Sequence, residues 1–135
     1  MHVIVAGGGV VGQRVAQAID AAGNTAVIIE ADAGRAAELT GRGLRVVTGN
    51  ACAPRCLEAA GALRADVMVA CTGTDEDNLI VAVLGRRHFR VPRIVAAVRD
   101  DANLWLFDEM WGVDAAISAA SALVTVIEQA AARSG

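Results

Sequence analysis

A glycine-rich turn between an apolar run and a helical pattern constrains most strongly how this chain can fold. Residues 2–6 are mostly apolar, which is typical of a buried strand, and three glycines, Gly7, Gly8 and Gly9, follow them. Gly7, Gly9 and Gly12 have the spacing G-x-G-x-x-G, in which the first glycine permits a sharp turn from a strand into a helix. The second lets the main chain approach a ligand, and the third lets the helix pack against the strand.

The following helix would point its free N–H groups and the positive end of its dipole toward a bound phosphate. Residues 26–29 form a second apolar run that ends in Glu30, where an acidic side chain accepts hydrogen bonds from ribose hydroxyls. We therefore predict a dinucleotide site, and the charge of Glu30 disfavours NADP, which carries a ribose 2′-phosphate. The helix face expected to dock on the sheet carries Val11, Val15, Ala18, Ile19 and Ala22.

Length and composition exclude several classes of protein. The 135 residues suffice for one domain, without a separate substrate domain beside a dinucleotide-binding one. The net charge of −3, without a basic stretch, disfavours nucleic acid as a partner. No apolar run approaches the ~20 residues that cross a bilayer, so we expect no membrane insertion and a cytoplasmic location.

The three cysteines do not indicate a metal site. Cys52 and Cys56 lack a neighbouring histidine or third cysteine, and we expect them and Cys71 to be small buried side chains.

Strand and helix patterns alternate along the chain. The predicted strands are residues 2–6, 25–30, 44–47, 66–70, 93–98 and 115–117, and the predicted helices are residues 10–22, 33–40, 54–60, 76–88, 101–111 and 119–132. This alternation predicts an α/β fold of Rossmann type, a doubly wound parallel six-stranded sheet in the order 3-2-1-4-5-6 with helices on both faces. The ligand then lies between the first and fourth strands, where Thr72 and Gly73 follow the fourth.

Several segments at matching spacing make the chain resemble the TrkA N-terminal domain, also called the RCK or KTN domain, of potassium-transport regulators. The resemblance extends to about Ala119 and rests on Gly7-Gly8-Gly9-Val10-Val11-Gly12, Glu30, Gly49-Asn50-Ala51, Thr72-Gly73, Asp75-Glu76-Asp77-Asn78, Val91-Pro92-Arg93, Leu106-Phe107 and Trp111-Gly112-Val113-Asp114. Such domains bind NAD(H), or in relatives ADP and ATP, and pass the ligand state to a membrane potassium channel or transporter. The resemblance thus implies a regulatory role. Carried over by position, the ligand contacts are Gly7, Gly8, Gly9, Val10, Val11, Gly12, Glu30, Asn50, Ala51, Thr72 and Gly73.

The chain departs from the family pattern at two positions. Asn50 stands where many members have aspartate, and Ala97 stands where an arginine near the end of the fifth strand usually helps to hold the ligand. Arg99, two residues further on, would face the same side of a strand and replaces that arginine only if it lies within reach of the ligand. The family's second, C-terminal ligand-binding lobe is also absent from this sequence, which fits either an excised domain or a single-lobe member.

Catalysis is disfavoured because hydride transfer needs an acid or base near the nicotinamide. His2 and His88 are the only histidines, and neither is expected at the C-terminal edge of the sheet, where Cys71 lies without a histidine partner. Two alternatives to a nucleotide-sensing regulator remain open. One is a small NAD-dependent oxidoreductase domain that lacks its catalytic half, and the other is an assembly subunit that has lost ligand binding.

Two segments are candidates for contact between subunits, because such domains form dimers and often rings beneath the pore. In the helix predicted over 101–111, the residues expected to dock on the sheet are Leu104, Leu106, Phe107, Met110 and Trp111. Trp105 falls on the polar side, where it is either an ordinary surface residue or a subunit anchor. We expect residues 1–118 to form the nucleotide-binding domain and residues 119–135 a crossover and dimerisation helix, with an apolar side formed by Leu123, Val124, Ile127 and Ala131.

Overall fold

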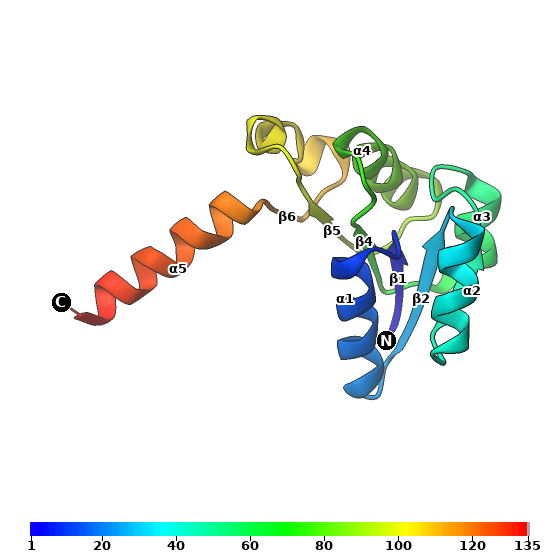
Figure 1. Cartoon of the computed structure of the whole chain (residues 1–135). Coiled ribbons are helices and arrows are strands. Elements are labelled where there is room, and N and C mark those ends of the chain that lie inside the picture. The colour runs from blue at the N-terminus through cyan, green and yellow to red at the C-terminus, as the bar shows by residue number, and fades with distance from the viewer. Residues whose placement is uncertain (135) are drawn as a thin grey trace.

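The computed structural model describes residues 1–134 as a six-stranded sheet with helices on both faces (Figure 1). The strands are all parallel and lie in the order β3-β2-β1-β4-β5-β6, which confirms the predicted fold and strand order. The elements are β1 (His2–Ala6), α1 (Val10–Ala21), β2 (Thr25–Glu30), α2 (Ala33–Gly41), β3 (Arg45–Thr48), α3 (Pro54–Ala59), η1 (Ala62–Arg64), β4 (Val67–Ala70), α4 (Asp75–Val83), η2 (Leu84–His88), β5 (Arg93–Ala97), η3 (Asp101–Leu106), η4 (Glu109–Trp111), β6 (Ala115–Ile117) and α5 (Ala119–Ser134). Within this described part, no helix combines the length and apolar character needed to cross a bilayer.

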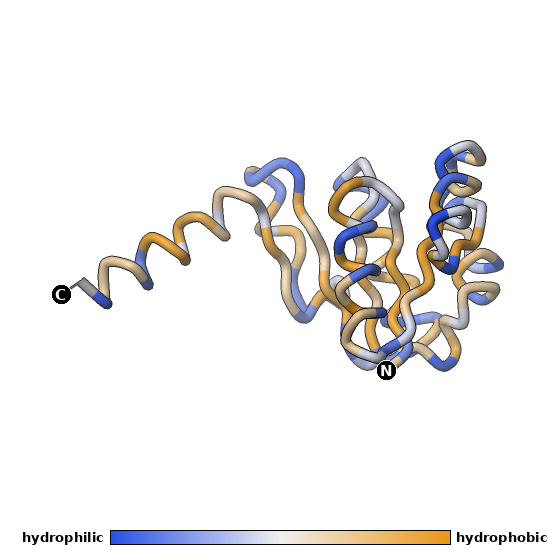
Figure 2. The backbone as a smooth tube through the Cα atoms, turned by 60° about the horizontal axis from the view of Figure 1, so that its bottom comes forward, coloured by the Kyte–Doolittle hydropathy of each residue, from blue (hydrophilic) through white to orange (hydrophobic). Residues whose placement is uncertain are grey.

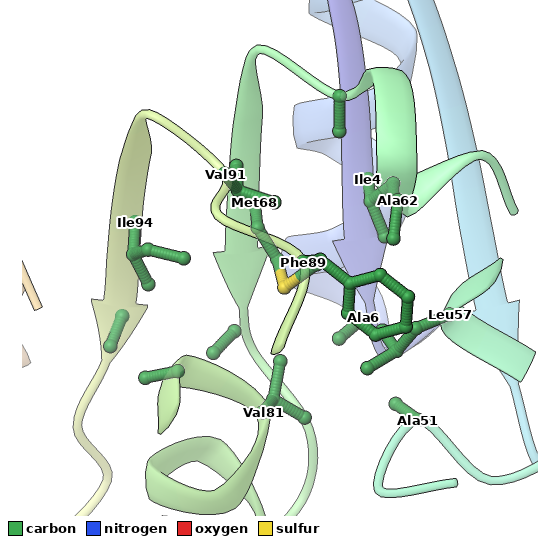
Figure 3. Close-up of a cluster of buried hydrophobic side chains, with 14 of the residues drawn as sticks. Ile4, Ala6, Ala51, Leu57, Ala62, Met68, Val81, Phe89, Val91 and Ile94 are labelled. Carbon is green, nitrogen blue, oxygen red and sulfur yellow. The ribbon is translucent and has the colours of Figure 1, made fainter. Parts of the chain in front are cut away.

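The sheet separates two apolar cores. The larger core lies on the face covered by α3, α4 and η3 and includes Leu57, Met68 and Phe89 (Figure 3). The smaller core lies on the opposite face, where α1 and α2 pack on β1 and β2 through residues such as Ala16 and Leu39. Burial on both sides explains why the central strands are almost continuously apolar.

Half of the second face is open in the single chain. The strand register places Ile28, Val5, Val69, Val95 and Ala115 in one row across this face. Ile28 and Val5 are fully buried under α1 and α2, Val69 and Val95 are half-buried, and Ala115 is exposed. In the part of the chain described, α5 runs away from the sheet instead of folding back over this row (Figure 1).

The docking face of α1 is rotated from the predicted one. Gly12 and Ala16 are the buried residues of α1, with Val15 and Ile19 half-buried beside them. Val11, Ala18 and Ala22, which were expected to dock, are exposed, so that part of the prediction is wrong. The close approach of Gly12 to the glycine turn sets which side of the helix faces the sheet.

The helix predicted over 101–111 is wrong, because the segment forms two short 3-10 helices, η3 and η4. The Asp108 side chain accepts hydrogen bonds from the main-chain N–H groups of Met110 and Trp111 and starts a new turn there. Phe107 is buried as expected, whereas Met110 is 73% exposed and does not dock on the sheet. Similarly, α4 ends at Val83, and the rest of the predicted 76–88 helix is the π-helical turn η2.

Candidate functional site

A cleft of about 300 Å³ lies at the carboxyl ends of β1, β2 and β4. Its lining residues are Gly7, Gly8, Gly9, Ile29, Glu30, Ala31, Arg35, Gly49, Asn50, Ala51, Cys71, Thr72, Gly73, Asp77 and Arg99. Nine of the twelve residues predicted for the site are therefore brought together around one cleft. The other three, Val10, Val11 and Gly12, do not line it: the two valines are exposed at the start of α1, and Gly12 is buried beneath the turn.

The glycine turn has the geometry that its spacing predicts. Gly7 has a φ of +115°, a conformation that L side chains rarely adopt, and a Cβ there would also lie 2.5 Å from the Cys71 carbonyl oxygen. A Cβ at Gly12 would lie 1.8 Å from the Gly7 carbonyl oxygen, so only glycine permits the helix to begin this close to the strand. Gly9, by contrast, faces open space, since no atom lies within 4 Å of its Cβ position.

The first turn of α1 is suited to an anion. Its N-cap is Gly9, which provides no side-chain hydrogen bond, so the N–H groups of the first turn are left for another acceptor. The dipole of this 12-residue helix adds partial positive charge at the same end. A phosphate group above Gly9 would satisfy both features.

Glu30 is a buried carboxylate that fixes the turn from the end of β2. It is 7% exposed, and its Oε1 accepts a hydrogen bond from the Gly8 N–H at 3.0 Å. Its Oε2 accepts from the Asp32 N–H at 2.7 Å, while the Arg35 guanidinium lies 3.4 Å from Oε1. Glu30 therefore both lines the cleft and holds the glycine turn against β2, and only the first of these roles was expected.

The loops after β3 and β4 form the remaining walls. Asn50 Oδ1 accepts a hydrogen bond from the Cys52 N–H at 2.8 Å, which closes a local turn. An aspartate at this position would accept the same bond equally well. The N–H and hydroxyl of Thr72 both donate to Asn78 Oδ1 at 2.7 Å. Thr72 was expected to contact the ligand, but both of its hydrogen-bond donors are already used within the protein.

Arg99 and Ala97 differ in their relation to the cleft. β5 ends at Ala97, which does not line the cleft and whose carbonyl accepts a hydrogen bond from Asn78 Nδ2 at 3.0 Å. Arg99 lies in the loop beyond the strand and does line the cleft. Arg99, two residues after Ala97, therefore places a positively charged residue at this edge of the cleft.

The three cysteines occupy partly buried positions, and two of them have raised pKa values. Burial raises the pKa of Cys71, which lines the cleft, to about 11. Burial, the charge of Asp77 and a hydrogen bond with Asp77 raise the pKa of Cys52 to about 11 as well. Among residues 1–134, no three His, Cys, Asp or Glu side chains are grouped so that they could hold a metal ion.

The histidines lie away from the cleft. His2 Nε2 is hydrogen-bonded to the Ala60 carbonyl oxygen at 2.8 Å, and the His88 ring packs edge-on against Phe89. Neither residue belongs to the cleft lining. The groups that face the cleft can thus bind and orient a ligand, and the cleft lining contains no imidazole for proton transfer.

Sequence reasoning missed Arg35 and Asp77 as cleft residues. Arg35 is in the first turn of α2, where its N–H donates to the N-cap Asp32, and its side chain reaches back to Glu30. The short interval between an acidic residue at a strand end and a basic residue in the next helical turn was the available signal for Arg35. Asp77 was noted only within the segment Asp75-Glu76-Asp77-Asn78 that carries the family resemblance.

Comparison with known proteins agrees with the fold and with the family resemblance. The model of the TrkA-N domain family matches residues 3–119. The Trk system potassium uptake protein TrkA of Mycobacterium tuberculosis (strain H37Rv) is 39% identical over 132 residues, which are 96% of this chain and 59% of that protein. The chain thus spans a little over half the length of this relative.

Solved structures are similar over most of the chain. The TrkA-N domain of the inner membrane protein YbaL from Escherichia coli has a TM-score of 0.83 at 21% identity and covers 95% of this chain and 94% of its own. The AMP-bound C-terminal domain of Kef from Shewanella denitrificans has a TM-score of 0.77 at 26% identity, covering 100% and 83%. The GsuK channel bound to NAD has a TM-score of 0.76 at 18% identity, covering 86% and 21%. With the family match over residues 3–119, the glycine turn and the sheet order, this chain belongs to the TrkA-N domain family.

Proposed function

We propose that this chain is a nucleotide-sensing regulatory domain or subunit of a potassium uptake channel or transporter. The observation that carries the proposal is the cleft, in which the open side of Gly9, the uncapped start of α1 and the Glu30 carboxylate face one space. Support also comes from the names of the relatives, which are potassium uptake proteins. The domain would act at the cytoplasmic side of the membrane through its transporter partner.

NAD(H) is the ligand that we propose for the cleft, with ADP and ATP as alternatives. NAD is bound in the similar GsuK channel, whereas AMP is bound in the similar Kef domain. Glu30 would accept hydrogen bonds from the adenosine ribose and repel a 2′-phosphate, which disfavours NADP. Arg99 would supply the positive charge for the phosphates, because Ala97 stands where family members usually have an arginine.

Calorimetric titration with NADH, NAD⁺, ADP and ATP tests the proposal, and absence of binding of all four at millimolar concentration would overturn it.

We infer a binding role rather than catalysis, because no histidine lines the cleft and the thiol of Cys71 has a raised pKa. Turnover of NADH with any small-molecule substrate would contradict this inference and favour the oxidoreductase alternative. Binding of nucleotide without turnover would favour the sensor.

For the assembly, we infer a dimer in which α5 of one copy covers the open sheet face of the other. Leu123, Val124 and Ile127 are all more than half exposed, and hydrophobic residues follow the length of α5 (Figure 2). The open face beside β6 is lined by small apolar side chains such as Val95 and Ala115. A parallel sheet is normally covered on both sides, so each surface provides what the other lacks.

Two further parts of the assembly are also inferred. We infer that residues 1–118 form the nucleotide-binding unit and that α5 (Ala119–Ser134) forms the dimerisation helix. Gly135, the last residue of the predicted 119–135 segment, lies outside the described residues. Trp105, which is 75% exposed on η3, anchors a second contact between subunits and allows rings to form. If Trp105→Ala leaves the assembly mass unchanged by light scattering, Trp105 is an ordinary surface residue.

A further inference from the structure

The first turn of α4 contains a carboxylate that accepts three hydrogen bonds from the segment after β5. Asp75 Oδ1 accepts from the Arg99 N–H at 2.6 Å, and Asp75 Oδ2 accepts from the Asp100 N–H and from Asn103 Nδ2, both at 3.0 Å. A single side chain on α4 therefore fixes residues 99–103 relative to the loop that follows β4.

Arg99 depends on this attachment for its position. The residue is exposed and lies beyond β5, so no strand pairing holds its main chain. Within residues 1–134 its guanidinium forms neither a hydrogen bond nor an ion pair, yet the residue lines the cleft. The bond from its N–H to Asp75 is the shortest of the three that Asp75 accepts.

Asp75 is held in its charged form. Burial alone would raise the pKa of Asp75, but the hydrogen bonds from Arg99, Asn103 and Asp100, together with the charge of Arg99, lower it below its usual value. The carboxylate is therefore ionised at neutral pH and provides the acceptors that these donors need.

A second side chain of α4, one turn after Asp75, fixes the loop that follows β4. Asn78 is fully buried and joins Thr72, in that loop, to Ala97, at the end of β5, through its amide group. With Asp75 one turn earlier, the start of α4 thus holds both loops that border this side of the cleft.

We propose that Asp75 is a positioning residue of the nucleotide cleft, which fixes the main chain at Arg99 so that the guanidinium stays over the cleft to meet the ligand's phosphates. This inference rests on the proposed function. It assigns to an acidic residue the task of strengthening the binding of an anion, which its charge alone would oppose.

The sign of the effect makes the proposal testable. Removing a negative charge near a phosphate site should tighten phosphate binding if only Coulomb interactions matter. Removing the acceptors for Arg99 and Asp100 should instead release the loop and weaken binding, because the bound geometry is no longer preorganised. Asp75→Asn separates the two effects, since it keeps the shape of the side chain but removes its charge and one acceptor oxygen.

The experiment measures ADP and adenosine affinities of the full chain by calorimetry. We expect Asp75→Asn to weaken ADP binding about tenfold, the loss of roughly one charge-assisted hydrogen bond, and to leave adenosine binding unchanged. The matched control is Glu76→Gln, which removes the neighbouring negative charge; the Glu76 side chain accepts no hydrogen bond in the described chain, and the variant should bind ADP as well as the parent or more tightly. In the Arg99→Gln background, the effect of Asp75→Asn on ADP should disappear.

Three results would overturn the inference: unchanged or tighter ADP binding by Asp75→Asn, an equal loss for adenosine, or additive effects of the Asp75 and Arg99 substitutions. If Asp75→Asn fails to fold by circular dichroism, Asp75→Glu serves instead, since it keeps the charge but moves the carboxylate, and selective loss of ADP binding is again expected. If the parent protein binds neither ADP nor NADH, the proposed function fails, and this inference fails with it.

Discussion

At the scale of single residues, two glycines of the turn have separable tasks. A Cβ at position 12 meets the Gly7 carbonyl oxygen at 1.8 Å, whereas a Cβ at position 9 meets nothing within 4 Å. Gly12→Ala should therefore destabilise the fold by about 3 kcal/mol or more through overpacking. Gly9→Ala should change stability by less than ~1 kcal/mol but weaken NADH binding at least about tenfold, because its methyl group occupies the space for the phosphates.

Urea denaturation and calorimetry check this pair of variants. Each glycine variant is the control for the other, since the same methyl group is added three residues apart on the same turn. Equal stability of the two variants would show that α1 does not begin as close to β1 as described.

Glu30 is expected to support both stability and binding. Replacing it with glutamine removes the charge from the bonds to Gly8 and Asp32 and leaves one of the two N–H groups facing an amide donor. We expect Glu30→Gln to lower the free energy of unfolding by about 1–3 kcal/mol and to weaken NADH binding. The control is Glu38→Gln, at an exposed glutamate that pairs with Arg42 on the surface of α2, where the change should stay within about 0.5 kcal/mol. Identical unfolding curves for the two variants would contradict this assignment.

Cys71 gives a pH-dependent readout of the cleft. With a pKa of about 11, its thiol is the neutral form at pH 8, and roughly one molecule in a thousand carries the reactive thiolate. We expect slow alkylation by iodoacetamide that accelerates as pH rises toward 11, and further slowing when NADH fills the cleft. Mass spectrometry of the modified peptide, with Cys71→Ser as the control, measures both effects. Complete alkylation within minutes at pH 8 would contradict the buried, neutral thiol.

The residues of the cleft were predictable where main-chain geometry determines them. The glycine spacing predicts the turn, and the strand end predicts the place of Glu30. The additional bond from Gly8 to Glu30 was not predictable, because it joins residues 22 positions apart and exists only once the turn has formed. Likewise, the use of the Thr72 donors by Asn78 follows from where α4 sits, which the motif does not specify.

At the scale of elements, α5 is a helix whose apolar residues, such as Leu123, Val124 and Ile127, are mostly exposed in the described chain. Its apolar residues gain nothing from exposure, so contact with a second copy should stabilise them. We expect Ile127→Asp to raise the dimer dissociation constant by about 100-fold or more, because a charge is buried without a partner. Analytical ultracentrifugation measures this change. Gln129→Asp is the matched control, because Gln129 lies on the opposite side of the helix and should leave the dimer intact.

Two outcomes would contradict the role of α5. A parent protein that stays monomeric at high micromolar concentration has no dimer for α5 to form. Equal weakening of the dimer by Ile127→Asp and Gln129→Asp would show that both substitutions act by destabilising the helix, and that the apolar side of α5 does not form the contact.

Helix periodicity failed as a guide between β5 and β6 for a local reason. The positions of Leu104 and Phe107 fit an amphipathic helix, and the two remain on the inner side of η3 because residues three apart eclipse in a 3-10 helix. Asp108 then caps a new turn, so the pattern does not continue to Met110. A side chain that bonds its own main chain competes with the regular helix, and hydrophobic spacing does not record that competition.

At the scale of the whole molecule, the alternation of strands and helices was sufficient to predict the sheet. Right-handed crossovers leave few arrangements for six parallel strands, and the glycine turn identifies which of these applies. The direction of α5 was not predictable in the same way, because neither a strand pairing nor a motif specifies it. In the proposed dimer, the exposed side of α5 would cover the open half of the sheet face of the other copy.

The central claim is that the cleft is a nucleotide sensor, and calorimetric titration of the parent protein and Gly9→Ala with NADH tests it most directly. The parent should bind one NADH per chain with a dissociation constant of about micromolar order, should bind NADPH at least about tenfold more weakly, and should lose NADH affinity on Gly9→Ala. Absence of heat with NADH, NAD⁺, ADP and ATP at millimolar concentration would contradict the claim. So would NADH binding that is unaffected by Gly9→Ala, because the ligand would then lie elsewhere.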